Sequence, residues 1–250
     1  MVDLSKITTE GKALFLAYDQ GLEHGPTDFN DENVNPNNIL DIAVKGKYNG
    51  VIFQKGIAED YYNESFRTQI PLILKLNGKT NLIDEDPYSP QICSVSEAVE
   101  LGATAVGYTI YVGSKFEPDM FKEFSKIEEE AHFGNIPIVA WMYLRGSGVA
   151  GKDPRELSAY GARIGLELGA DIIKMKYPES LDSLKWAVES AGRTKVVISG
   201  GDKIEESEFL ELAETVMKSG AMGMAVGRNI WQHPNPLELT KKLKKIIFAQ

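Results

Sequence analysis

Two lysines stand inside an otherwise apolar segment, Ala170–Tyr177. Lys174 and Lys176 are two residues apart, so in a β-strand their side chains point to the same face. Burial and repulsion between like charges both lower the pKa of an amine, and a neutral amine is what attack on a carbonyl carbon requires. The pattern therefore predicts a nucleophilic lysine that forms a Schiff base. It does not choose between the two, because Lys174 lies deeper in the segment while Lys176 is better placed for charge support.

A second group of chemically useful side chains alternates along residues 141–145. Trp141, Tyr143 and Arg145 are each two residues apart, so we expect them to share a face. A phenol can donate and accept a proton, and a guanidinium suits phosphate or carboxylate. An aromatic core layer is the alternative. It explains Trp141 readily and Arg145 poorly.

Polar residues also follow two apolar runs nearer the N-terminus. Asp19 comes directly after the apolar letters LFLAY, and His24 follows in the next turn. Asp19 is expected at the rim of a pocket, unless it satisfies a loop; His24 would bind phosphate or cap that loop. Lys75 shares a face with Asn77 in an apolar segment, where an unpaired lysine is costly. It would line the pocket beside Asp19 or pair structurally.

Glycine-rich turns close two later apolar runs. Ser199, Gly200 and Gly201 follow one of them, and Gly227 and Arg228 follow the other. Bare backbone N–H groups in such turns can approach a phosphate closely. Glycine also merely permits tight turns, but two such turns with an added arginine favour the phosphate interpretation.

The elements that would position these residues recur along the chain. Eight apolar runs have strand length, and several are rich in Val and Ile. They are Ala13–Ala17, Val51–Gln54, Leu72–Leu76, Ala105–Ile110, Ile136–Trp141, Asp171–Met175, Lys195–Ser199 and Met222–Val226. Apolar residues at helical spacing predict helices at Phe116–His132, Pro154–Leu168, Ser180–Ala191, Glu205–Lys218 and Pro236–Phe248.

Alternation of strand and helix predicts a parallel sheet with right-handed crossovers, and eight units favour closure. We therefore expect an α/β chain that forms one domain, a single (β/α)8 TIM barrel over residues 1–250, with its site at the C-terminal strand ends. An open doubly wound sheet is the alternative, weakened because no GxGxxG follows the first run. The longest irregular stretch is Lys79–Ser94, whose acidic run at 84–86 is expected to be a solvated loop, although loops at this end often cover the site.

Composition narrows the classes of protein further. The net charge of −9 over 250 residues argues against nucleic acid or an anionic membrane as the main partner, because both need a basic surface. No apolar run approaches the roughly 18–20 residues of a membrane span, and the N-terminus lacks the apolar region of a signal peptide. A single cysteine, Cys93, fits a reducing compartment, so we expect a cytoplasmic protein. The three histidines lack ligand spacing, so no metal and no other cofactor is expected.

Several segments together resemble the archaeal-type class I fructose-bisphosphate aldolases. They are YDQGLEHGP (18–26), WMYLRG (141–146), GADIIKMKYP (169–178), ISGGDK (198–203) and AVGRNIWQ (225–232). The resemblance runs from about residue 15 to residue 232. It implies cleavage or formation of fructose 1,6-bisphosphate, a sugar phosphate, through a Schiff base, and it implies a homo-oligomer.

The resemblance also implies roles for the matching residues. Lys174 resembles the Schiff-base lysine, Tyr143 the proton donor and Asp19 the carboxylate that supports the carbinolamine and iminium. Trp141 and Arg145 resemble the substrate wall and the anchor of the distal phosphate. The residues that resemble the near phosphate site are Ser199, Gly200, Gly201, Gly227 and Arg228. We expect His24 and Lys176 to contact substrate as well.

Two other kinds of activity remain open from the sequence. Relatives with the same lysine make 2-amino-3,7-dideoxy-D-threo-hept-6-ulosonate by transaldol transfer, and a bacterial group acts as a thiolase on a phosphorylated metabolite. A non-catalytic sugar-phosphate binding barrel is an alternative of a different class. The lysine pair argues against it, because binding alone has no use for a desolvated amine.

Overall fold

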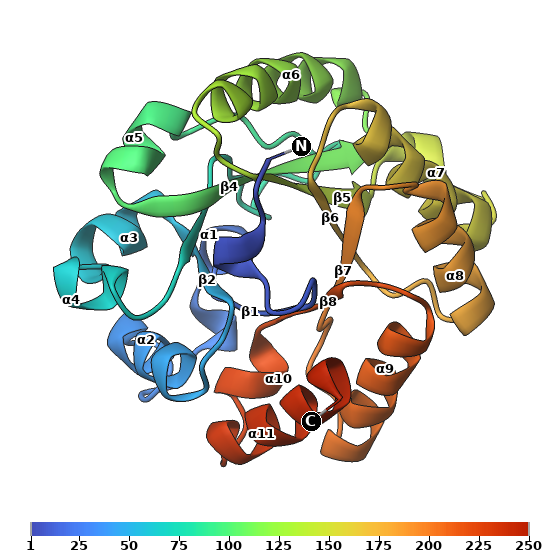
Figure 1. Cartoon of the computed structure of the whole chain (residues 1–250). Coiled ribbons are helices and arrows are strands. Elements are labelled where there is room, and N and C mark those ends of the chain that lie inside the picture. Colours follow the sequence, from blue (N-terminus) through green and yellow to red (C-terminus); the bar gives the residue numbers. More distant parts are fainter. Residues whose placement is uncertain (1, 250) are drawn as a thin grey trace.

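The computed structural model describes residues 2–249 and forms a closed barrel of eight parallel strands in the order β1 to β8 (Figure 1). The (β/α)8 TIM barrel is confirmed, and the open sheet is wrong. The strands are β1 Ala13–Ala17, β2 Gly50–Gln54, β3 Leu72–Lys75, β4 Ala103–Val112, β5 Ile138–Leu144, β6 Ile172–Met175, β7 Lys195–Ser199 and β8 Gly223–Val226.

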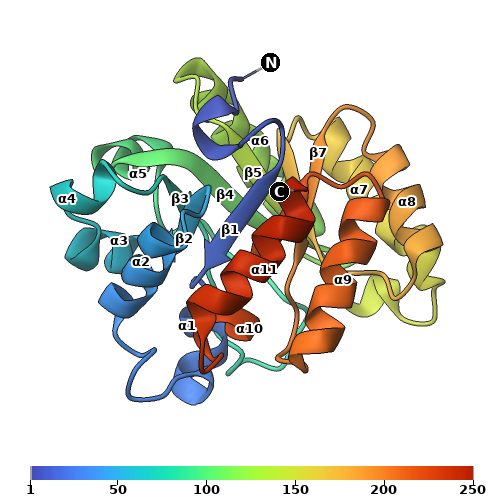
Figure 2. The ribbon, with the colours of Figure 1, turned by 60° about the horizontal axis from the view of Figure 1, so that its bottom comes forward.

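The helices are α1 Gly21–His24, α2 Pro36–Lys45, α3 Lys55–Tyr61, α4 Glu64–Arg67, α5 Val95–Glu100, α6 Glu117–Phe133, α7 Pro154–Glu167, α8 Leu181–Ser190, α9 Glu206–Lys218, α10 Arg228–Trp231 and α11 Pro236–Phe248. Most of them form an outer ring around the strands, while the short α1 and α10 lie at one end of the barrel (Figures 1 and 2). Short 3-10 turns are η1 Ser5–Ile7, η2 Gly25–Asp28 and η3 Ser147–Val149. Within residues 2–249, no helix combines the length and apolar character that a membrane crossing requires.

The five helices predicted from periodicity are present to within about one residue at each end. Local capping explains why α7 begins where it does. The Asp153 carboxylate accepts a hydrogen bond from the backbone N–H of Arg155, and Pro154 occupies the first turn. Strand β5 differs from prediction, because it continues to Leu144, past the apolar run that ends at Trp141. Strand β4 pairs with it along this extension, up to Val112 opposite Leu144.

The barrel interior is filled by every second residue of the strands. Phe15, Ile73 and Ile172 belong to a buried apolar cluster inside the barrel, and Ile7 of η1 joins it at the N-terminal end. Figure 1 shows η1 across the centre of that end. The next inward positions of β3 and β6, toward the C-terminal ends, are Lys75 and Lys174. Strand alternation therefore places charged side chains directly above a dry apolar layer.

The stretch 79–94 is irregular but anchored. Asp84 and Glu85 are exposed, as predicted for a solvated loop. Asp86 is different, because its carboxylate accepts hydrogen bonds from the backbone N–H groups of Lys115, at 2.7 Å, and Ser147, at 2.9 Å. The loop after β3 is thereby tied to the segments that follow β4 and β5.

Gly107 on β4 makes room for the Trp141 ring, because a Cβ at residue 107 would lie 1.6 Å from an atom of that ring. We expect Gly107→Ala to lower the free energy of unfolding by about 3 kcal/mol, since overpacked cores must shift side chains or backbone. For a chain of this size the apparent melting temperature should fall by roughly 6–12 °C. Gly56→Ala is the matched control, because its Cβ would meet nothing within 4 Å. Equal melting temperatures for the two variants, measured by circular dichroism at one scan rate, would contradict this account.

Candidate active site

A cavity of about 320 Å³ opens at the C-terminal ends of the strands. The side chains that line it come from the ends of β1, β3, β5 and β6 and from the turns after β1, β7 and β8. The predicted site residues among them are Asp19, His24, Tyr143, Arg145, Lys174, Lys176, Ser199, Gly200, Gly201, Gly227 and Arg228. The structure thus brings together eleven residues from five distant segments of the chain.

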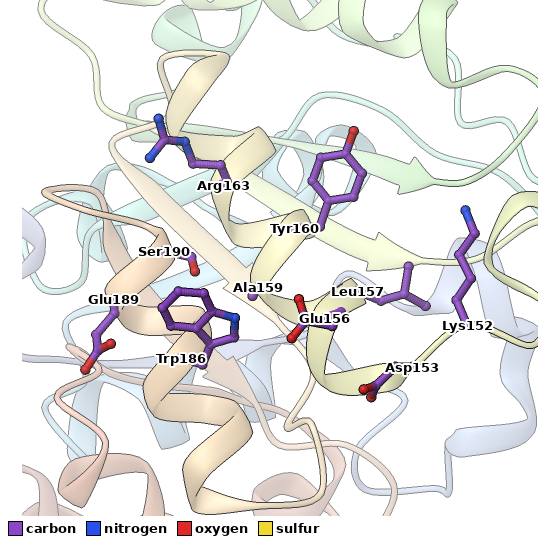
Figure 3. Close-up of a pocket in the computed structure, with 10 residues that line it drawn as sticks. All are labelled: Lys152, Asp153, Glu156, Leu157, Ala159, Tyr160, Arg163, Trp186, Glu189 and Ser190. Carbon is purple, nitrogen blue, oxygen red and sulfur yellow. The ribbon is translucent and has the colours of Figure 1, made fainter.

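A larger hollow, of about 800 Å³, lies on the outside of the barrel between α7 and α8 (Figure 3). Trp186 and Tyr160 line it together with charged side chains such as Arg163 and Glu156. Arg163 pairs with Glu167 on its own helix, at 2.6 Å, with both side chains more than half exposed. Solvated groups of this kind are not tuned for proton or carbonyl chemistry, so we place the chemistry in the smaller cavity.

Lys174 is buried near the end of β6, with 4% of its surface exposed. Its Nζ lies 3.9 Å from Asp19 Oδ1 and 5.0 Å from the centre of the Trp141 ring. Burial lowers the pKa of Lys174 to about 8, against the pull of Asp19 and with further help from Lys75. About one tenth of this amine is therefore neutral at pH 7 and ready to act as a nucleophile.

Asp19 stands between two lysines. Its Oδ2 lies 3.3 Å from Lys75 Nζ, a shorter separation than the one to Lys174. Burial alone would raise the pKa of Asp19, but the two lysines hold it below its usual value, so the carboxylate stays charged. Of the two possibilities for Lys75, the structure shows both: it lines the cavity and it pairs with Asp19.

Lys176 lies just beyond the end of β6, lines the cavity and is exposed. The sequence predicted that the charge of Lys176 would lower the pKa of Lys174 by like-charge repulsion. That expectation is wrong, because the lysine whose charge lowers the pKa of Lys174 is Lys75, on β3. The exposed ammonium of Lys176 is screened by solvent, whereas Lys75 acts through the buried interior.

The Tyr143 phenol lines the cavity beside these charges. Burial, followed by the nearby carboxylates Asp19 and Glu23, raises the pKa of Tyr143 well above its usual value. The phenol is therefore protonated at neutral pH and can donate a hydrogen bond or a proton. Trp141 from the same strand does not line the cavity: it is fully buried beneath Lys174, rather than forming the predicted wall.

Arg145 donates a hydrogen bond from Nη1 to Glu23 Oε1 at 2.6 Å. Glu23 is buried on α1 and lines the cavity, but it was not among the residues predicted from sequence. The sequence carries one indication of its position, because Glu23 lies four residues after Asp19, which is about one turn of a helix. The prediction of a loop for this segment hid that spacing. The ion pair fixes one side of the guanidinium and leaves its other N–H groups for a ligand.

The turns after β7 and β8 form another part of the cavity lining. Gly201 has a φ of +69°, in the left-handed region, with nothing within 4 Å of a Cβ built there. At Gly227 a Cβ would lie 2.9 Å from the carbonyl oxygen of Ala17, so the close approach of these strands requires glycine. Arg228 donates to Asp202 at 2.7 Å and lies 3.5 Å from Asp28.

His24 lies beside this second arginine. Its Nδ1 is 2.9 Å from Asp28 Oδ2, so Asp28 contacts both His24 and Arg228. The Asn229 side chain donates to the carbonyl oxygens of Gly200 and Asp202, each at 2.9 Å, and joins the two glycine turns. This arrangement presents a guanidinium, an imidazole and open backbone on one wall, which suits a phosphate.

Metal chemistry has no obvious ligand set in this cavity. Over residues 2–249, no group of three His, Cys, Asp or Glu side chains is arranged to hold a metal ion. The chemistry available from the residues present is nucleophilic attack by an amine, proton donation by a phenol, and charge stabilisation by a carboxylate.

Comparisons with known proteins agree with this chemistry. The chain is 48% identical over 242 residues to "Fructose-bisphosphate aldolase class 1" of Thermoproteus tenax, covering 96% of this chain and 90% of that protein. It is 42% identical over 248 residues to the protein of the same name from Halobacterium salinarum, covering 98% and 94%. It is 36% identical to a Methanocaldococcus jannaschii protein named "Fructose-bisphosphate aldolase/6-deoxy-5-ketofructose 1-phosphate synthase", covering 99% and 83%.

A solved structure of an archaeal fructose-1,6-bisphosphate aldolase superposes with a TM-score of 0.93 at 46% identity, covering 98% of each chain. That protein is described with its catalytic lysine covalently bound to the carbinolamine intermediate of the substrate. The model of the DeoC/LacD family aldolases matches residues 13–233. The chain therefore belongs to the DeoC/LacD aldolase family.

Proposed function

We propose that this chain is a Schiff-base (class I) aldolase that cleaves fructose 1,6-bisphosphate to dihydroxyacetone phosphate and glyceraldehyde 3-phosphate, or forms it from them. One observation carries the proposal: the buried amine of Lys174, with its pKa lowered to about 8, beside a charged carboxylate. The names of relatives at 42–48% identity point to the same substrate.

The first steps use the Lys174 and Asp19 pair. The neutral Nζ of Lys174 attacks the C2 ketone carbon, and the carbonyl oxygen takes up a proton to give a carbinolamine. Loss of water leaves an iminium cation at Nζ. Asp19, held charged, stabilises this cation, and the Trp141 ring beneath Nζ offers a π face to it.

Carbon–carbon bond chemistry then follows from the iminium. In the cleavage direction the C3–C4 bond breaks, and its electron pair flows to the nitrogen to leave a neutral enamine. In the condensation direction the enamine carbon attacks the aldehyde, and the protonated phenol of Tyr143 donates to the new C4 oxygen. In cleavage this transfer runs in reverse: Tyr143 accepts the C4 hydroxyl proton in its minor, deprotonated form, after its own proton has passed to solvent.

The two walls of the cavity suit the two phosphates of the substrate. We assign the distal phosphate to Arg145. The near phosphate is assigned to the glycine turns and to the side chains beside them: Ser199, Gly200, Gly201, Gly227, Arg228 and His24. Lys176 at the rim adds a mobile positive charge. Holding both ends orients the bond that breaks, which lowers the entropic part of the barrier.

We also propose a cytoplasmic homo-oligomer that serves glycolysis and gluconeogenesis. The single cysteine fits a reducing compartment. The exposed aromatic rings of Tyr160 and Trp186 (Figure 3) are of the kind that subunit contacts cover. Light scattering during size-exclusion chromatography should give a mass of two or more times the 27.6 kDa of one chain. A mass of one subunit at micromolar concentration would reject this part of the proposal.

Trapping tests the covalent step. Incubation with fructose 1,6-bisphosphate followed by borohydride reduction should place an adduct on Lys174, located by peptide mass spectrometry, because reduction fixes the imine. Lys174→Met should abolish the adduct and lower kcat by about 10³-fold or more, because the amine that attacks the ketone is removed.

Lys176→Met is the matched control, and its adduct should remain on Lys174. An adduct on Lys176 in the unaltered protein would move the assignment. Cleavage without any modified lysine would reject the Schiff base. Slow cleavage of fructose 1,6-bisphosphate combined with rapid transfer to an amino acid semialdehyde would favour the heptulosonate synthase instead.

Removal of the phenol tests the proton transfer separately. Tyr143→Phe should lower kcat for cleavage by about 10²- to 10⁴-fold, the usual contribution of a positioned acid or base. The Lys174 adduct with dihydroxyacetone phosphate should still form, because attack by the amine does not need the phenol. Loss of both cleavage and adduct would show that Tyr143 acts earlier than proposed.

A further inference from the structure

Lys75 has no part in the mechanism described so far, yet it is one of the few buried charges in the barrel. It is the last residue of β3, with 4% of its surface exposed, and it lines the cavity. Among residues 2–249, its ion-pair partner is Asp19, at 3.3 Å. A lysine in such a position needs an anion close by, because an isolated buried ammonium is very costly.

The charges around Lys75 do not balance. One carboxylate serves two buried amines, and it lies closer to Lys75 (3.3 Å) than to Lys174 (3.9 Å). With both amines protonated, the buried group would carry a net positive charge of one. The excess positive charge is removed at the lowest free-energy cost when the amine with the longer contact to Asp19 loses its proton.

We propose that Lys75 is a positioning residue for the aldolase reaction: it holds Asp19 in a direct ion pair and so leaves Lys174 as the amine that loses its proton. The proposal rests on the proposed function. It adds a role at a later step as well, because the fixed charge of Lys75 disfavours a second cation at Lys174. The iminium can relieve that repulsion by drawing in the electron pair of the C3–C4 bond, which leaves the neutral enamine.

Other groups face the same space and must be accounted for. Asp19 and Glu23 approach from the end of β1 and from α1, Tyr143 and Arg145 from β5, Lys176 from the end of β6, and Arg228 from α10. Glu23 is matched by Arg145 at 2.6 Å, and Arg228 by Asp202 at 2.7 Å. Asp19 is therefore the carboxylate left to set the balance between the two buried lysines.

The test follows the pH dependence of imine formation with dihydroxyacetone phosphate, trapped by cyanoborohydride and located on Lys174 by mass spectrometry. In the unaltered protein the rate should rise with a midpoint near pH 8, as the amine deprotonates. In Lys75→Met, the Asp19 carboxylate no longer pairs with Lys75 and can pair with Lys174. This pairing favours the protonated form of Lys174 and raises the pKa of Lys174. The midpoint should move up by at least one pH unit, so the rate at pH 7 falls about tenfold or more and recovers above pH 9.

Two variants separate this role from a structural one. Lys75→Arg retains the positive charge and should keep the midpoint near that of the unaltered protein. Lys176→Met removes a cavity lysine that has no ion pair with Asp19. Its rate should fall equally at every pH through weaker phosphate binding, while its midpoint stays in place. A Lys75→Met profile that is lowered equally at every pH, with an unmoved midpoint, would overturn the proposal while the adduct on Lys174 still supports the aldolase.

A measurement on the unaltered chain covers the case in which Lys75→Met does not fold. With ¹³C-labelled lysine, the signal of Lys174 can be followed by NMR from pH 6 to 11. It should titrate with a midpoint near pH 8. A midpoint at the ordinary value of a solvated lysine would overturn the proposal.

Discussion

A single buried carboxylate shared by two lysines is the constraint on which the rest of the site depends. Asp19 stays charged because both amines surround it, and it is paired more closely with Lys75 than with Lys174. The Trp141 ring and the apolar interior underneath supply no second anion to match the remaining charge. Proton loss from Lys174 is the remaining relief, and the same loss makes its amine a nucleophile.

Closure of the barrel is what brings these three charges together. Asp19, Lys75 and Lys174 come from or just after β1, β3 and β6, which are not neighbours in the sheet. In a closed parallel barrel all strands end at the same rim, and alternate residues point to one shared interior. An open sheet would leave the ends of β1 and β6 far apart, so the shared carboxylate requires the closed form.

Local patterns in the sequence predicted most of the fold and only part of the site. Apolar runs and caps depend on neighbouring residues, so the strands and outer helices were predicted closely. The position of Lys75 beside Asp19 was predicted as one of two possibilities, but its shorter distance to Asp19 than that of Lys174 depends on three-dimensional geometry that no local pattern gives. Lys176 obeys the alternation with Lys174, but β6 ends at Met175, so its side chain reaches solvent. Trp141 was expected in the cavity wall, yet Gly107 opens space for its ring deeper in the barrel.

On the proposed assignment, Arg145 and Arg228 would let an acidic chain hold an anionic ligand. With a net charge of −9, long-range attraction of a bisphosphate is absent, so binding must come from local geometry. Arg145 and Arg228 are each held by a carboxylate, Glu23 at 2.6 Å and Asp202 at 2.7 Å. Such pairing fixes the guanidinium groups before the ligand arrives and reduces the entropy lost on binding. Pairing with a carboxylate also weakens the attraction of each arginine for a single phosphate. A ligand with two phosphates, one at Arg145 and one at Arg228, is therefore favoured over a ligand with one phosphate.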